Sequence, residues 1–309
     1  MSVGVDRSTA IQAADDRPSP SKLAEEQRSF MTEGRLKAIC LIALATPLIV
    51  LLILFGTAFA QALPRLNLDF LTGYPSRAAA TAGVLPALVG TVCLMALTFV
   101  LAVPVGISAA VYLEEYAKPS KLVSIIEVNI ANLAGVPSII YGLLGLELFV
   151  RALGLGRSLL AGAATLALLL LPLIIITSRE ALRTVPREWR DASKALGATE
   201  WQTIWRVVLP ACTPNILTGV ILSVARAIGE TAPLITIGAL TYVAFLPDSL
   251  SSPFSALPIQ IFNWVSRPQR DFHENAAAGI VVLLVVLLVL NGGAILLRAR
   301  LSRARDAGR

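Results

Sequence analysis

An arginine and a glutamate lie four residues apart inside a long apolar stretch, as Arg226 and Glu230 of the string RAIGETAPL. At this spacing the two side chains share one face of a helix and can reach each other. A charge at the centre of a membrane helix costs roughly 2.5–3.5 kcal/mol on insertion scales, so the pair needs compensation. The planar donors of Arg226 suit the oxygens of an anion such as phosphate, with Glu230 orienting them or accepting a proton-bearing oxygen. The alternative is a structural pair that neutralises itself.

A second candidate segment is NLAGVPSIIYGLLG, residues 132–145, in which small residues surround a proline. If it lines a polar path, Ser138 and Tyr141 would offer hydroxyl groups to a substrate. A bend with glycines such as Gly135 and Gly142 is also common where helices pack closely in lipid. Both interpretations stay open on the sequence.

Little else in the sequence suggests catalysis. The one histidine, His273, lies near Asp271 and Glu274 in a polar stretch that is more typical of a solvated loop than of a metal site. The three cysteines lack CxxC spacing, and we find no nucleophile–base or metal constellation. The net charge is +6, but no basic-aromatic module accompanies it. We therefore expect a protein that is not an enzyme, uses no cofactor or metal, and binds no nucleic acid.

Arg226, Glu230 and the segment 132–145 all lie in or beside long apolar stretches of the chain. Of 309 residues, 56% are hydrophobic and 15% are charged, which is too little charged surface for a soluble domain of this length. Six apolar blocks are separated by short polar stretches, as bilayer thickness requires of spanning helices. The expected spans are residues 38–60, 84–112, 123–150, 159–177, 211–236 and 276–297. The sequence thus predicts an all-α integral membrane protein with about six transmembrane helices in contact with lipid. Pro86, Pro104 and Pro137 are the expected bends.

Lysine and arginine are shared unequally between alternate connections. Nineteen of them lie in the two ends of the chain, in the connection after residue 112 and in residues 178–210, against six in the remaining connections. The positive-inside rule then predicts cytoplasmic termini, a cytoplasmic 178–210 loop and an even number of spans. We expect a polar tail over residues 1–37, a first span over 38–60, a core over 82–298 and a basic tail over 299–309.

The longest of these basic connections predicts two short helices. Pro186 suits the first turn of one helix, and Gly197 suits its C-terminal end. Thr199 and Gln202 form a capping-box pattern that opens a second helix, which we expect to end before Pro210. One side of the first helix is apolar and consists of Trp189, Ala192, Ala195 and Leu196. Such a helix either lies on the lipid surface or docks its apolar side into a groove on a partner.

This loop resembles the EAA loop of type-1 ABC importer permeases. The string DASKALGATEWQTIWRVVLP follows the pattern EAA, three residues, Gly, nine residues, Ile-x-Leu-Pro. The matching positions are Asp191, Ala192 and Ser193, then Gly197, then Val207, Leu209 and Pro210. The departures are Asp for Glu, Ser for Ala and Val for Ile. The resemblance implies the type-1 permease fold, with a coupling helix that docks on an ATPase subunit. Because the chain has no GxxxxGK[ST] run, ATP hydrolysis is expected from another subunit.

Three strings narrow the resemblance. RAIGETAPL, residues 132–145 and NWVSRPQ at residues 263–269 closely resemble phosphate importer permeases of the PstA type, and the likeness covers about residues 80–300. The resemblance implies that the chain is a subunit of an importer of inorganic phosphate in the cell membrane of a prokaryote. Its implied partners are a sister permease in a heterodimer, two cytoplasmic ATP-binding subunits and an extracytoplasmic phosphate-binding protein.

Two other functions stay open. The coupling loop is shared across substrates, so the importer could serve another oxyanion or nutrient. A secondary transporter driven by an ion gradient would need no docking loop.

Overall fold

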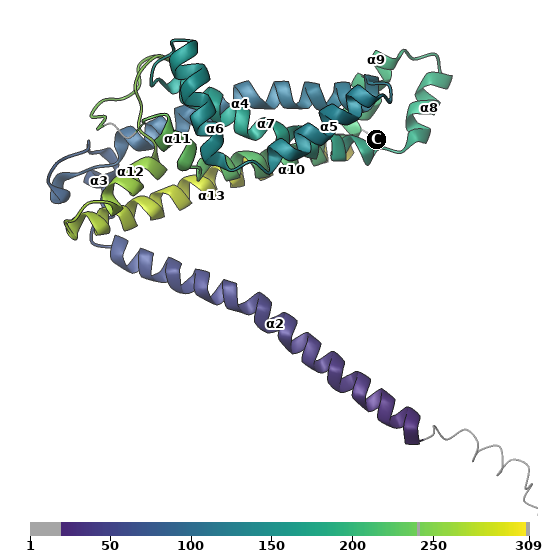
Figure 1. The fold of residues 1–309 in the computed structure, drawn as a ribbon, viewed down its shortest axis with the longest axis horizontal. Helices are drawn as coiled ribbons and strands as arrows, with labels where there is room; N and C mark the ends of the chain where they lie inside the picture. Colours follow the sequence, from purple (N-terminus) through teal and green to yellow (C-terminus); the bar gives the residue numbers. More distant parts are fainter. Residues whose placement is uncertain (1–19, 240–241, 307–309) are drawn as a thin grey trace, which may run out of the picture. The chain divides into compact units, whose positions relative to one another are not determined.

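A computed structural model describes residues 20–239 and 242–306 of the chain (Figure 1). Every regular element in these residues is a helix, which confirms the predicted all-α class. The chain divides into two units, Met1–Thr57 and Ala58–Arg309. The candidate site residues lie in the second unit.

Helix α2 (Pro20–Ala62) supplies the described part of the first unit. Its segment Gly34–Ala62 is apolar and 29 residues long. About 20 helical residues cross the hydrocarbon core of a bilayer, so this segment is long enough to span it. The helix begins at Pro20, so the second half of the predicted polar tail is helical, while residues 1–19 lie outside the described residues.

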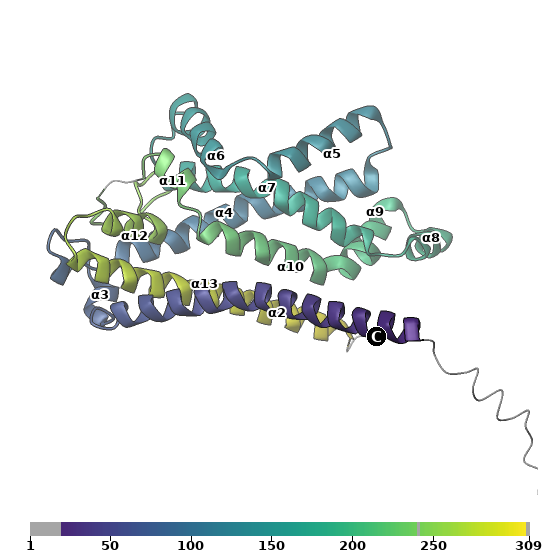
Figure 2. The same cartoon turned by 60° about the horizontal axis from the view of Figure 1, so that its bottom comes forward.

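Four long helices form the frame of the second unit. They are α4 (Leu85–Val111), α7 (Leu159–Arg183), α10 (Leu209–Ile228) and α13 (Asp271–Asp306). Helix α7 packs against both α4 and α10, and α10 packs against α13 (Figures 1 and 2). Glycines permit this closeness, because a Cβ on Gly106 would lie 2.6 Å from Ile174 Cγ2 and one on Gly219 would lie 2.6 Å from Thr177 Oγ1. Small residues at helix contacts are typical of membrane bundles, where tight packing stabilises association.

The third predicted span is broken. Helix α5 (Lys121–Ala134) is followed by α6 (Ser138–Gly145), and the π-helix η3 (Leu146–Ala152) continues α6. The two halves are bent by 103°. The break has a local cause, because Pro137 lacks an N–H and disfavours helical geometry at the residue before it. The structure therefore has five helices that could each cross a membrane among the described residues, or six if the bent pair counts as one span, in agreement with the prediction of about six.

The fifth predicted span is also interrupted, and this corrects the sequence-based picture. Helix α10 ends at Ile228, and the short helix α11 (Ala232–Thr236) follows after a gap. Pro233 lies in the first turn of α11 and cannot donate to a preceding carbonyl, which favours a new helix over a continuation. Arg226 thus lies in the last turn of a helix and Glu230 lies beyond its end, whereas the sequence had placed both near the middle of one span.

Pro86 and Pro104, two of the prolines at which bends were expected, both lie within the single helix α4. Pro86 lies in the first turn of α4, where a proline starts a helix, and Pro104 lies inside α4, which continues past it. The end of the bundle near the start of α4 also holds α3 (Leu68–Thr72), η1 (Ala79–Thr81) and α12 (Leu257–Val265). Phe70, Trp264 and Phe272 form a buried aromatic cluster there. Helix α8 lies at the opposite end of the bundle (Figures 1 and 2).

Candidate functional site

The predicted docking loop forms the helix that the sequence indicates. Helix α8 (Arg187–Ala195) begins after Pro186, and Gly197 has φ +84°, the left-handed conformation that ends helices. The capping box is present: Thr199 N–H donates to Gln202 Oε1 at 2.9 Å, and Gln202 N–H donates to Thr199 Oγ1 at 3.2 Å. These local signals were sufficient to predict the loop.

The second helix of the loop does not end before Pro210, contrary to the prediction. Helix α9 (Glu200–Thr203) passes through the π-helix η4 (Ile204–Val208) directly into α10. In η4 the Leu209 N–H donates to the Ile204 carbonyl, a wide turn that relaxes the ordinary spacing of hydrogen bonds just before Pro210. Pro210 itself lies in the first turn of α10, where a missing N–H is tolerated.

The loop exposes four large apolar side chains. The side chains involved are Leu196, 90% exposed, Trp201, 60%, Trp205, 53%, and Trp189, 40%. Asp191 and Ala192 are exposed as well. Ser193 instead faces α9, where its Oγ lies 2.9 Å from Thr203 Oγ1. Leu209 packs against the core and Pro210 is half-buried, so these two residues shape the loop without adding to its exposed face.

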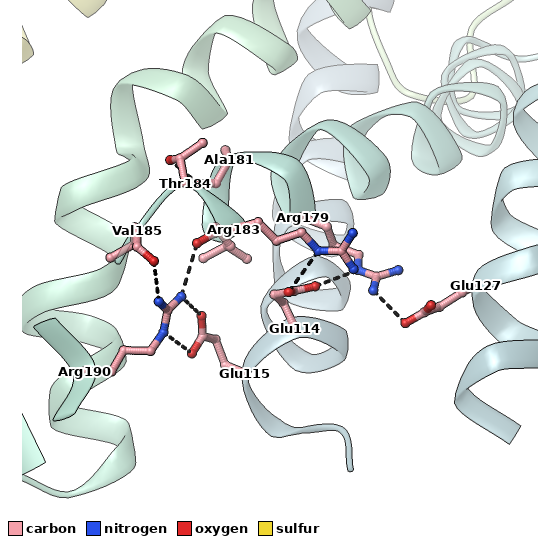
Figure 3. Close-up of polar contacts among 10 residues, drawn as sticks. Glu114, Glu115, Glu127, Arg179, Ala181, Arg183, Thr184, Val185 and Arg190 are labelled. Carbon is pink, nitrogen blue, oxygen red and sulfur yellow. Dashed lines mark hydrogen bonds and ion pairs between the residues drawn. The ribbon is translucent and has the colours of Figure 1, made fainter. Parts of the chain in front are cut away.

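Arg190 attaches α8 to the rest of the bundle (Figure 3). Its Nη2 and Nε donate to the two carboxylate oxygens of Glu115 at 2.6 and 3.1 Å. Its Nη1 and Nη2 also donate to the carbonyls of Val185 and Leu182 at 2.7 and 3.1 Å, near the C-terminal end of α7. A cation there satisfies carbonyls that lack helical partners. The hydrogen bonds with Glu115 raise the pKa of Arg190 above its ordinary value, against burial, which lowers it.

Glu115 lies on the π-helical turn η2 (Tyr112–Tyr116), and the neighbouring Glu114 joins a second cluster. Arg179 Nε lies 3.3 Å from Glu114 Oε2, and Arg179 Nη2 lies 2.6 Å from Glu127 Oε1 on α5. Arg183 Nε donates to Glu114 Oε1 at 3.0 Å (Figure 3). The sequence reasoning treated these arginines only as loop charges and gave Glu127 no role. The two adjacent glutamates at the end of an apolar block were the available signal.

A polar cavity of about 670 Å³ lies between α8, the end of α7 and η2. It is lined by Glu114, Glu115, Arg183, Val185, Arg187, Arg190, Asp191 and Lys194. The side of α8 that faces the bundle is therefore charged and held by ion pairs, and its other side is apolar and exposed. This division is what a helix needs if it docks on a partner while remaining fixed to its own chain.

Arg226 and Glu230 form an ion pair at the break between α10 and α11. Arg226 Nε lies 3.6 Å from Glu230 Oε1, and the side chains are 63% and 15% exposed. At this distance the pair is beyond ordinary hydrogen-bond length. Within the part of the chain that the structure describes, the two Nη groups of Arg226 make no hydrogen bond. The guanidinium thus keeps most of its donors available.

Ser138 and Tyr141 lie on α6, which packs against α11. Tyr141 is buried, and its hydroxyl donates to the Leu133 carbonyl at 2.8 Å across the break between α5 and α6. A Cβ on Gly142 would lie 1.8 Å from Thr236 Oγ1. Tyr141 and Gly142 therefore favour the close-packing interpretation of this segment. Ser138 is the half-buried first residue of α6, and no hydrogen bond between described residues joins it to Arg226 or Glu230.

Apolar helices long enough to span a bilayer, one of them broken, and an exposed amphipathic helix fixed to the end of the bundle are the features of a multi-pass membrane protein. The comparison with protein families gives its class: residues 102–304 match the family described as "Binding-protein-dependent transport system inner membrane component". The chain belongs to this family. Its description is that of a membrane component, which agrees with the prediction of a permease subunit that is not an enzyme.

The relatives share substantial sequence. "Phosphate transport system permease protein PstA 1" of Mycobacterium tuberculosis (strain CDC 1551 / Oshkosh) is 39% identical over 187 residues, 60% of this chain and 61% of the relative. The chain thus spans less than two thirds of that relative's length. "Phosphate transport system permease protein PstA" of Haemophilus influenzae (strain ATCC 51907 / DSM 11121 / KW20 / Rd) is 35% identical over 235 residues, 76% of this chain and 82% of the relative.

The fold also matches a solved structure. A chain from the crystal structure of a bacterial ABC transporter involved in the import of the acidic polysaccharide alginate aligns with a TM-score of 0.59 at 16% identity. The alignment covers 90% of this chain and 98% of that chain. The likeness shows the type-1 ABC importer permease fold that the resemblance of the coupling loop had implied.

Proposed function

We propose that the chain is the permease subunit of an ATP-driven importer of inorganic phosphate, and that it forms half of the translocation path. The observation that carries the proposal is Arg226. It is a largely exposed guanidinium at the end of a helix that is apolar enough to cross a membrane, and its Nη donors are unused in the described chain. A charge in such a place is costly against lipid and typically faces a water-filled path or another subunit. The relatives that are phosphate transport system permease proteins support phosphate as the anion.

We further propose that α8 docks on a cytoplasmic ATPase subunit. Its exposed apolar side would enter a groove on that partner, and the ion pair between Arg190 and Glu115 would hold the helix in place. The working complex would contain this chain, a sister permease, two copies of the ATPase and an extracytoplasmic phosphate-binding protein.

The substrate is tested with the complete complex in liposomes. With all subunits present, ATP should drive accumulation of labelled phosphate, and an excess of unlabelled phosphate should compete while sulfate should not. A preference of about tenfold or more corresponds to at least 1.4 kcal/mol of discrimination. Equal uptake of sulfate would contradict phosphate specificity, and uptake by this chain alone without ATP would support a secondary transporter.

The proposed orientation makes a separate prediction. Reporters fused after Lys37, within residues 180–206 and after Arg309 should all report the cytoplasm, and one near Ser252 should report the opposite side. The basic loop is the informative position, since α8 can reach an ATPase only from the cytoplasm. A reporter there that responds only outside the membrane would contradict ATPase docking.

A further inference from the structure

The adjacent residues Glu114 and Glu115 contact different parts of the bundle. Both lie on the π-helical turn η2 at the end of α4. Glu115 holds α8 through Arg190, and Glu114 holds α7 through Arg179 and Arg183. A π-turn inserts one extra residue per turn and is frequent at functional sites. The two carboxylates are therefore held on one short segment, so a displacement of one displaces the other.

Arg179, which is half-buried, bridges Glu114 and Glu127. Its side chain is 12% exposed and lies between two carboxylates from different helices, 3.3 Å from Glu114 and 2.6 Å from Glu127. Arg183 contacts the same Glu114 but is 57% exposed. An ion pair that is largely shielded from water is often no better for stability than apolar residues of the same size. We therefore assign Arg179 a role in fixing the position of α5 relative to η2, beyond any contribution to stability.

From α5 the contacts continue toward Arg226 and Glu230. The Tyr141 hydroxyl ties α6 to the last turn of α5 through the Leu133 carbonyl. Gly142 of α6 lies against Pro233 and Thr236 of α11, so closely that a Cβ would lie 2.6 Å from Pro233 Cα. Helix α11 begins two residues after Glu230. The chain of contacts therefore runs from α8 to the ion pair at the end of α10.

We infer that Arg179 is a positioning residue that transmits movement of α8 to the broken pair α5–α6, by joining Glu114 on η2 to Glu127 on α5. The inference rests on the proposed function, in which α8 is moved by an ATPase and α10 and α11 carry the anion site. Contiguity alone does not establish coupling, which requires that a change at Arg179 separates the two activities. Loss of the relay uncouples transport from hydrolysis, and loss of a purely structural contact lowers both together.

The test compares Arg179→Gln with the matched control Arg183→Gln in the reconstituted complex. Both variants remove one positive charge next to Glu114, but only the first removes the bridge to α5. For Arg179→Gln we expect normal co-purification of the ATPase, hydrolysis within about twofold of wild type, and phosphate transported per ATP reduced about tenfold, a coupling loss within the usual range. Arg183→Gln should keep the wild-type ratio within about twofold, since exposed pairs contribute little.

Two further variants keep the inference falsifiable if Arg179→Gln does not assemble. Glu127→Gln leaves Arg179 paired with Glu114 and should also lower the transport-to-hydrolysis ratio. Arg179→Lys keeps the charge without the two-pronged geometry and should give an intermediate ratio. A proportional fall of transport and hydrolysis in Arg179→Gln, or in Glu127→Gln where Arg179→Gln does not assemble, would overturn the relay. A wild-type complex that carries sulfate in place of phosphate would contradict only the proposed substrate, and the ratio would then be measured with sulfate.

Discussion

Replacing Arg226 with glutamine should abolish phosphate uptake while the subunit still inserts, assembles and binds the ATPase. The guanidinium is 63% exposed and is held only loosely by Glu230, so its removal leaves the packing of α10 intact. What is lost, if the bound anion closes over Arg226, is one partner of a hydrogen-bonded charge pair, and truncating such a partner costs about 2–5 kcal/mol, roughly 30-fold or more in binding. The measurement is ATP-dependent phosphate uptake by the reconstituted complex, with ATPase co-purification as the control for assembly.

A double variant that also replaces Glu230 distinguishes an anion-binding site from a structural ion pair. If Arg226 serves only to neutralise Glu230, the double variant Arg226→Gln with Glu230→Gln should transport normally, because neither residue then carries an uncompensated charge. If Arg226 binds phosphate, the double variant should fail as completely as the single one. Arg226→Lys should also transport poorly, since an ammonium keeps the charge but loses the planar pair of donors. Robust uptake by the double variant would show that the pair is structural.

Helix ends that depend on a few neighbouring residues could be predicted from the sequence. The left-handed Gly197 and the capping box of Thr199 with Gln202 each depend on a few neighbouring residues, so both could be predicted without tertiary contacts. The apolar blocks were found for a similar reason, because bilayer thickness imposes a length on each of them. Helix α12 was missed because it is only nine residues long and lies in a stretch read as a connection.

Interruptions of long helices were harder to predict, because they depend on which of several prolines ends a helix. Pro104 lies inside α4, which continues past it, whereas Pro137 lies at the 103° bend between α5 and α6. Pro233 likewise begins a new helix, and this moves Arg226 from mid-span to a helix end. Neighbouring helices decide whether carbonyls freed by a proline find new partners, and that information is not local.

The ion-pair clusters could not be predicted from the sequence, because their partners are distant along the chain. Arg190 and Glu115 are 75 residues apart in sequence, and Arg179 and Glu127 are 52 apart. Sequence shows many arginines and glutamates at the ends of apolar blocks, but not which of them meet. The clusters matter for function, because they fix the helix whose opposite side is predicted to meet the ATPase.

Replacing Leu196 with glutamate should release the ATPase from the complex without unfolding the loop. Leu196 is 90% exposed, so the substitution removes almost no packing within the chain. A carboxylate buried without a partner in an apolar groove costs several kcal/mol, and even about 2.8 kcal/mol corresponds to a hundredfold rise in Kd. Leu68→Glu is the matched control, since Leu68 is 76% exposed and begins α3, the helix at the opposite end of the bundle from α8 (Figure 1). Co-purification of the ATPase should be lost with Leu196→Glu and kept with Leu68→Glu. Undiminished ATPase binding by the Leu196 variant would favour the alternative in which α8 lies on the lipid surface.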